Sequence, residues 1–262
     1  MKIHILSDLH IEFEDYTYPA CDADVVVLAG DIHAKDKGVI WAAENIPNIP
    51  VIYVLGNHEY YGKAHPKFIG EIKSRAQGSN VHVLENDHAK IDGVNFIGCT
   101  LWTNFELFGD PRIAGYQCQQ VMNDYKKIRK SPRYSKLRSL DVAIIHANSL
   151  RWLDKTLEAL SGDTNVVVSH HAPSIYSAPV NKRTDITTSA YVSDLAELVS
   201  MREPNYWIHG HLHNSSEYDM GNCKVYCNPK GYPGEENPYY DPYKCIEING
   251  RKERDSNSHV IL

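Results

Sequence analysis

The chain has 262 residues, of which 42% are hydrophobic and 23% are charged, and this ordinary globular composition argues against a fibre or a disordered chain. Its formal net charge is −6, so it lacks a global basic field that would attract nucleic acid or an anionic membrane. No apolar run approaches the roughly 18 residues of a membrane helix, and the N-terminus has no signal-like segment. We therefore expect a cytoplasmic protein. Histidine stands out with 14 residues, and it is the commonest metal ligand.

Short apolar, β-branched runs alternate with helical patterns along the chain. Such runs are typical of strands buried on both faces, and they lie at 3–6, 25–29, 51–55, 94–98, 166–169, 206–209, 224–226 and 244–248. Amphipathic patterns predict helices at 38–45, 66–77, 140–160 and 193–201. The alternation favours an α/β fold with layered sheets and helices, which we predict to form one domain over residues 1–262.

One stretch, at about 103–139, has few apolar clusters and is predicted to be an insertion or cap on this domain. Its second half is strongly basic. Between positions 124 and 138 the only acidic residue is Asp124, and the basic residues are Lys126, Lys127, Arg129, Lys130, Arg133, Lys136 and Arg138. Two interpretations remain open for the basic stretch 126–138. It is either a solvated helix face or a lining of a site entrance that attracts phosphate.

Five predicted strands end in aspartate, asparagine or histidine. These residues are Asp8 and His10, then Asp31, then Asn57, His58 and Glu59, then His170 and His171, and finally His211 and His213. In open α/β sheets ligands bind outside the carboxyl ends of the strands, so topology gathers these side chains at one place. The glycines Gly30, Gly56 and Gly210 stand beside them and allow the backbone to approach closely.

An oxygen and nitrogen donor set without thiolate suits Mn²⁺, Fe or Zn²⁺ better than Ca²⁺. The set is too large for one open tetrahedral site and is about right for two ions that share a carboxylate. Two such ions clamp a phosphoryl group and lower the pKa of a water molecule, which then becomes the nucleophile. The donors therefore indicate a dinuclear centre, with Mn²⁺ as the preferred metal and Fe or Zn²⁺ as alternatives.

The ordered series Asp8-x-His10, Gly30-Asp31, Gly56-Asn57-His58-Glu59, His170 after a strand, and Gly210-His211-x-His213 resembles the calcineurin-like metallophosphoesterases. The match runs from position 8 to position 213 in the order typical of that family. The resemblance implies a layered α/β/β/α sandwich of two mixed β-sheets flanked by helices. It also implies a hydrolase that acts on phosphoesters.

The resemblance further implies a role for each site residue. The first metal would be held by Asp8, His10, Asp31 and His213, and the second by Asp31, Asn57, His170 and His211, with Asp31 bridging. His58 would act on the leaving group as the catalytic residue, and Asp8 would steer His58 as well as bind metal. Glu59 would orient backbone near the site, and His171 would face substrate or support a ligand. Trp102 would either border the pocket or anchor the cap.

Two departures narrow the expected substrate. Protein Ser/Thr phosphatases of this family carry arginines shortly after the Gly-Asp pair and before Gly-Asn-His-Glu, but this chain has His33 to Lys35 and Leu55 there. We therefore expect hydrolysis of a small phosphodiester or phosphomonoester, with diesters slightly favoured and no membrane or nucleic-acid partner. A protein phosphatase-like monoesterase and a non-catalytic, protein-binding scaffold of the same fold are the alternatives. The retained ligands and His58 weigh against the scaffold.

Overall fold

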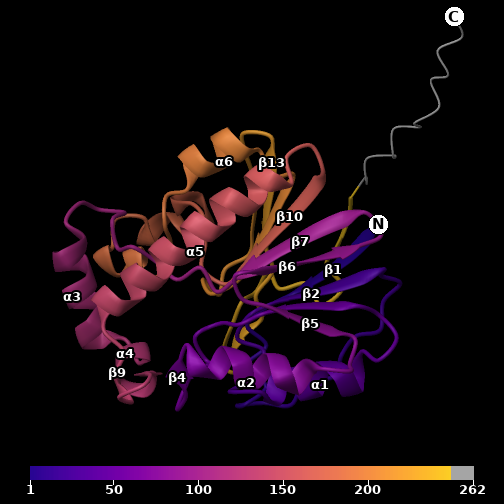
Figure 1. Ribbon diagram of the computed structural model, residues 1–262, viewed down its shortest axis with the longest axis horizontal. Coiled ribbons are helices and arrows are strands. Elements are labelled where there is room, and N and C mark those ends of the chain that lie inside the picture. The colour runs from indigo at the N-terminus through magenta and orange to yellow at the C-terminus, as the bar shows by residue number, and fades with distance from the viewer. Residues whose placement is uncertain (249–262) are drawn as a thin grey trace, which may run out of the picture.

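The computed structural model describes residues 1–248 as two mixed β-sheets packed face to face, with helices on both outer faces (Figure 1). This arrangement confirms the predicted α/β/β/α sandwich. The central strands of the two sheets, such as β2 (Val25–Ala29) and β10 (Thr164–Ser169), are buried along their whole length, because each sheet is covered by the other sheet on one side and by helices on the other.

The first sheet has the strand order β16-β1-β2-β3-β5, parallel throughout except for the antiparallel β16. Its strands are β1 (Lys2–Leu6), β2 (Val25–Ala29), β3 (Val51–Val54), β5 (Val81–Leu84) and β16 (Cys245–Glu247). Helices α1 (Lys37–Asn45) and α2 (Lys67–Ala76) cover its outer face, where Val39 and Phe68 pack in a shared core with Val26 and Tyr53.

The second sheet has the order β12-β13-β11-β10-β7-β6, with antiparallel strands only at its two edges. Its strands are β6 (Asp87–Ile91), β7 (Val94–Cys99), β10 (Thr164–Ser169), β11 (Tyr206–His209), β12 (Ser216–Met220) and β13 (Cys223–Cys227). Helices α5 (Ser139–Ala159) and α6 (Ala196–Arg202) cover it from outside. Between the two sheets, Ile5 and Val27 pack with Val166 and Ile208.

The eight strands predicted from apolar runs are all present, but the sequence reasoning missed the edge strands β6 and β12 and the strand β5. The two edge strands are mainly polar, and none of their residues is fully buried, so they lack the continuous apolar run that marks a buried strand. The four predicted helices are present as well, although the last begins at Ala196 rather than near Ser193.

The segment 103–139 forms helices α3 (Pro111–Val121) and α4 (Asp124–Lys127) and the strands β8 (Arg129–Lys130) and β9 (Ser135–Lys136). These strands form a small sheet with β4 (Ala64–His65). The basic stretch is therefore mainly a hairpin rather than a helix face. In Figure 1 the segment lies at the left end of the sandwich, where α3 packs on α5.

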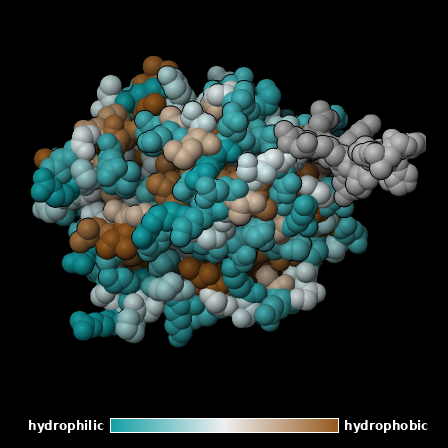
Figure 2. All heavy atoms as spheres, turned by 45° about the horizontal axis from the view of Figure 1, so that its top comes forward, coloured by the Kyte–Doolittle hydropathy of each residue, from teal (hydrophilic) through white to brown (hydrophobic). Residues whose placement is uncertain are grey.

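On the face shown in Figure 2, hydrophobic residues form small separate spots among hydrophilic ones. Within residues 1–248, no helix combines the length and the apolar character that crossing a bilayer requires.

Candidate metal centre

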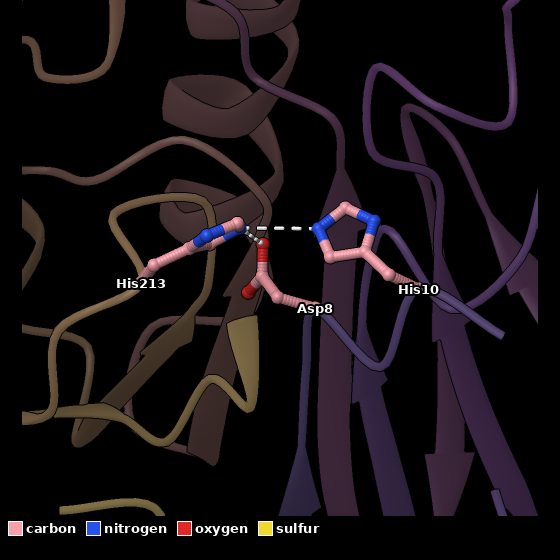
Figure 3. A group of neighbouring side chains, drawn as sticks. All are labelled: Asp8, His10 and His213. Atoms are coloured by element: carbon pink, nitrogen blue, oxygen red, sulfur yellow. Dashed lines mark hydrogen bonds and ion pairs between the residues drawn. The ribbon is translucent and has the colours of Figure 1, made fainter. Parts of the chain in front are cut away.

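The loops after β1 and β11 bring Asp8, His10 and His213 together (Figure 3). Their ligand atoms all lie within 4.8 Å of one another. His213 Nε2 is 3.1 Å from His10 Nε2 and 3.4 Å from an oxygen of Asp8. All three side chains point to a common centre, which is the arrangement that a single cation bound between them requires.

A second cluster consists of Asp31, His170 and His211, again with ligand atoms within 4.8 Å of one another. His170 Nδ1 lies 2.9 Å from the carbonyl oxygen of Ala29, to which it donates, so Nε2 is the ring nitrogen that faces the other members of the cluster. That nitrogen lies 3.1 Å from Asn57 Oδ1 and 3.5 Å from Asp31 Oδ2. A histidine whose second nitrogen is held by a backbone carbonyl is oriented as a metal ligand is.

Asp31 connects the two clusters. Its Oδ2 atom is 3.5 Å from His170 Nε2 and 4.0 Å from His10 Nε2, while its Oδ1 accepts from the backbone N–H of His58 at 2.8 Å. Although burial acts in the opposite direction, the surrounding imidazoles, His170 first among them, hold the pKa of Asp31 well below its ordinary value. Asp31 is therefore an anion within reach of both clusters.

The residues present fit two metal ions. His211 Nε2 is buried and finds no hydrogen-bond partner within residues 1–248, and a buried polar atom of this kind is costly unless it binds something. Burial and the neighbouring imidazoles of His171 and His170 hold the pKa of His211 well below its ordinary value, so its lone pair is free. The donors are imidazole nitrogens and carboxylate or amide oxygens, which suit Mn²⁺, Fe and Zn²⁺.

Backbone strain concentrates at the same place. Positive φ angles between 48° and 73° occur at five of the proposed ligands, namely Asp8, His10, Asp31, His211 and His213. Non-glycine residues rarely adopt this left-handed conformation, which costs of order 1–3 kcal/mol each and clusters at functional sites. Each of these residues stands in a sharp turn at or just after a strand end, and the turn aims its side chain at the centre.

Two glycines stand where the backbone passes close to a ligand. A Cβ atom at Gly210 would lie 2.5 Å from an Asp8 carboxylate oxygen, and one at Gly56 would lie 2.1 Å from Asp31 Oδ1. Any side chain at these positions would have to displace the carboxylate.

Glu59 connects the loop that follows β2 with the loop that follows β3. Its carboxylate accepts from the backbone N–H groups of Asp31, Ile32 and Gly56 at 2.8–3.1 Å, and from the hydroxyl of Tyr53 at 2.7 Å. Burial and the Asp31 carboxylate raise the pKa of Glu59 to about 7. Glu59 therefore orients the backbone that carries the site rather than the substrate.

His58 stands between two partners. Its Nδ1 lies 2.6 Å from a carboxylate oxygen of Glu12, and its Nε2 lies 2.9 Å from the hydroxyl of Tyr232 in β14 (Gly231–Tyr232). Although burial opposes the charge, Asp31 and Glu12 raise the pKa of His58 above its ordinary value. Although burial acts the other way, hydrogen bonds from His10 and His58 lower the pKa of Glu12 to about 2.

The expectation that Asp8 steers His58 is corrected by this geometry. Both Asp8 oxygens accept from the backbone N–H of His211, at 3.0 and 3.1 Å, and one also faces His213. The carboxylate against His58 belongs to Glu12, which also lies 3.3 Å from His10 Nδ1.

Two further candidates lie behind the clusters. His171 packs its ring on His211 with centroids 4.2 Å apart and places Nδ1 3.3 Å from the carbonyl oxygen of Thr100. Trp102 is buried against His171 and Tyr60. Neither side chain lines the cavity described below. His171 packs against His211 from inside the fold, and Trp102 packs behind His171.

A cavity of about 660 Å³ opens above the clusters. Its lining includes Asp31, Asn57, His211 and His213 from the candidate metal centre and residues 121–124 from segment 103–139. The other lining residues are Tyr61, Pro179, Lys182, Thr187, Thr188, Tyr191, Leu212, Tyr232 and Glu235. The basic stretch 126–138 contributes no residue to this lining, so the interpretation as a solvated surface is favoured. Lys127 Nζ lies 4.6 Å from the ring centroid of Tyr61, which lines the cavity.

Sequence reasoning missed Glu12, Tyr232 and Asp124. Glu12 follows His10 by two residues, in the pattern Asp8-x-His10-x-Glu12, and this spacing was a usable signal. Asp124 was visible as the single acid beside a basic run. Tyr232 carried no local signal, because only the tertiary fold brings it to His58.

Comparison with known proteins agrees with this geometry. Residues 1–215 match the model of the calcineurin-like phosphoesterase family, and the chain belongs to that family. Uncharacterized protein L509 of Acanthamoeba polyphaga mimivirus is similar over nearly its whole length, with 26% identity over an alignment 279 positions long that covers 94% of this chain and 96% of the viral protein.

Among solved structures, the phosphopantetheinyl hydrolase PptH of Mycobacterium tuberculosis has a similar fold, with a TM-score of 0.70. The superposition covers 89% of this chain and 90% of the mycobacterial one, at 16% sequence identity. At that identity the likeness concerns the fold alone.

Proposed function

We propose that this protein is a metal-dependent phosphoesterase that hydrolyses a small phosphodiester or phosphomonoester, with diesters favoured. The observation that carries the proposal is the pair of buried ligand clusters, joined through Asp31 and opening into one cavity beside His58. Two bound dications, Mn²⁺ in our proposal and otherwise Fe or Zn²⁺, would supply an activated water and neutralise phosphoryl charge.

The proposed ligands of the first metal are Asp8, His10, Asp31 and His213, and those of the second are Asp31, Asn57, His170 and His211. His58 is the proposed catalytic residue. The Glu12 carboxylate keeps a proton on Nδ1 of His58. The other ring nitrogen of His58, Nε2, can then donate a proton to the leaving-group oxygen. In this proposal Asp8 acts as a ligand, and Glu12 takes over the steering of His58.

The cavity wall supports a diester. Its lining has one cation, Lys182, against the acids Asp124 and Glu235 that lie outside the two clusters. A phosphomonoester carries more negative charge than a phosphodiester and needs more positive partners outside the metals. The aromatic and aliphatic parts of the wall, such as Tyr191 and Leu212, suit an organic ester group.

The site favours neither of the two alternative functions, which are a protein phosphatase-like monoesterase and a non-catalytic, protein-binding scaffold. No arginine lines the cavity formed by the described residues, so the phosphate clamp of a protein phosphatase-like enzyme has no counterpart in its wall. A protein-binding scaffold would not need to retain two complete ligand clusters together with a buried His58–Glu12 pair.

The test removes metals with a chelator, restores Mn²⁺, Fe²⁺ or Zn²⁺ separately, and compares p-nitrophenyl phosphate with bis-p-nitrophenyl phosphate. We expect hydrolysis of both and a higher kcat/KM for the diester. Asp31→Ala should abolish it together with metal binding, whereas the exposed Asp87→Ala serves as control and should leave both unchanged. Absence of hydrolysis with every metal would refute the enzyme proposal.

A second variant tests the catalytic residue. His58→Ala should lower turnover by about 10²–10⁴-fold, the usual contribution of a general acid, while both metals stay bound. Loss of metal in His58→Ala would instead identify His58 as a ligand.

A further inference from the structure

Asp124 is the single acidic residue next to a run of seven basic ones, and it points away from them into the protein. It opens α4 in the cap and is only 3% exposed. Within residues 1–248 its carboxylate forms no ion pair with any of the neighbouring lysines or arginines. Its partners belong to the metal centre instead.

One oxygen of Asp124 receives two hydrogen bonds. Asn57 Nδ2 donates to Asp124 Oδ1 at 2.9 Å, and the hydroxyl of Tyr61 donates to the same atom at 2.8 Å. Asn57 Nδ2 also donates to the Tyr61 hydroxyl oxygen at 3.2 Å. The amide nitrogen of Asn57 is thus held by two acceptors on the cap side of the site.

This arrangement decides which end of the Asn57 amide faces the second cluster. The amide oxygen lies 3.1 Å from His170 Nε2, on the side of the proposed ligands. Only that oxygen can bind a cation, because the amide nitrogen has no available lone pair. Rotation of the amide by 180° would turn its N–H groups toward the metal and leave two acceptors opposite an oxygen.

The second cluster has fewer carboxylates around it than the first to balance the charge of a bound cation. Asp8 and Asp31 both lie at the first cluster, and Glu12 lies 3.3 Å behind its ligand His10. The second cluster has the shared Asp31 as its one carboxylate within residues 1–248, together with the Asn57 amide and the imidazoles of His170 and His211. Asp124 is the carboxylate behind Asn57, in the place that Glu12 takes behind His10.

We propose that Asp124 is a positioning residue for the second metal, which acts by holding the amide of Asn57 with its oxygen toward the cluster. The cap thereby completes a metal site whose ligands all come from the sandwich. The inference rests on the proposed dinuclear function. It assigns to segment 103–139 a task at the metal centre besides walling the cavity.

The test is a titration of the metal-free protein with Mn²⁺ alone, in which the electron paramagnetic resonance signal of free Mn²⁺ measures how much metal is bound. The wild type should bind two equivalents. Asp124→Leu, of similar size, should leave the first equivalent unchanged and weaken the second by about 10–100-fold, as loss of a partner behind a ligand generally does. Asp124→Asn retains an acceptor oxygen and should restore part of the affinity.

Tyr61→Phe is the matched control. It removes a hydroxyl from the same network but keeps the bond from Asn57 to Asp124, so the second equivalent should weaken much less than in Asp124→Leu. Circular dichroism checks that each variant is folded, and Asp124→Asn provides the measurement if Asp124→Leu does not fold.

Two results would overturn the inference. If the wild type binds two equivalents and both Asp124 variants bind them with unchanged affinity, the positioning role is refuted while the proposed function stands. If the wild type binds fewer than two equivalents of Mn²⁺, the proposed dinuclear Mn²⁺ centre fails and this inference fails with it.

Discussion

A single added methyl group at Gly210 should weaken metal binding at the first proposed site and leave binding at the second intact. The Cβ atom of Gly210→Ala would lie 2.5 Å from an Asp8 carboxylate oxygen and 2.9 Å from Ser7 Oγ, against an ordinary contact distance of 3.4 Å or more. The carboxylate of Asp8 therefore has to move by about 0.9 Å, or the loop has to shift by as much. Metal–ligand distances tolerate only about 0.2 Å.

We expect Gly210→Ala to lose most of its affinity for the first Mn²⁺ and to retain the second, because the second cluster does not include Asp8. Overpacking at this buried position should also lower the free energy of unfolding by about 1–3 kcal/mol. Gly56→Ala should affect both metals, since the added Cβ would lie 2.1 Å from Oδ1 of the shared Asp31.

Gly70→Ala is the control variant, because here the added methyl group should raise the free energy of unfolding instead of lowering it. Gly70 lies in the interior of α2, and an added Cβ would meet no atom within 4 Å. Alanine is favoured over glycine in a helix by roughly 0.5–1 kcal/mol, so this variant should be stabilised and bind both metals. Urea unfolding and Mn²⁺ titration measure the two effects. Gly210→Ala with wild-type affinity for two equivalents and wild-type stability would refute the close-approach argument.

Two further predictions concern buried carboxylates. Besides Asp31, Glu12 raises the pKa of His58, so Glu12→Gln should move the basic limb of the kcat profile to lower pH. An unmoved limb would exclude His58 as the proton donor. Glu85 is buried, and burial raises its pKa from 4.5 to about 7. The unfolded chain releases this proton first, so stability is lost as pH rises from about 4.5 through 7, by up to about 3 kcal/mol. Glu85→Gln can still accept from both Thr100 donors and should lose less stability between pH 5 and pH 8 in urea unfolding; equal losses in both proteins would contradict the assignment.

The sequence by itself predicted the layered α/β fold and, through its resemblance to the family, the sandwich, and it also suggested the metal ligands that we propose. Strands such as Val25–Ala29 are apolar over their whole length because both faces are buried, so their runs are visible in the sequence. The polar residue that follows each strand lies at a carboxyl end, and parallel topology gathers those ends at one place. The edge strands Asp87–Ile91 and Ser216–Met220 escaped because one side of each faces solvent.

Only the tertiary structure decided which residues stand behind the ligands. Glu12, Asp124 and Tyr232 reach the centre from a loop, from the cap and from a late hairpin, at sequence separations of 46, 67 and 174 residues from their partners. Hydrogen bonds across such separations depend on how loops fold over the sandwich, which local patterns do not encode. The same reason explains why Trp102 does not line the cavity and why the carboxylate in contact with His58 belongs to Glu12 rather than to Asp8.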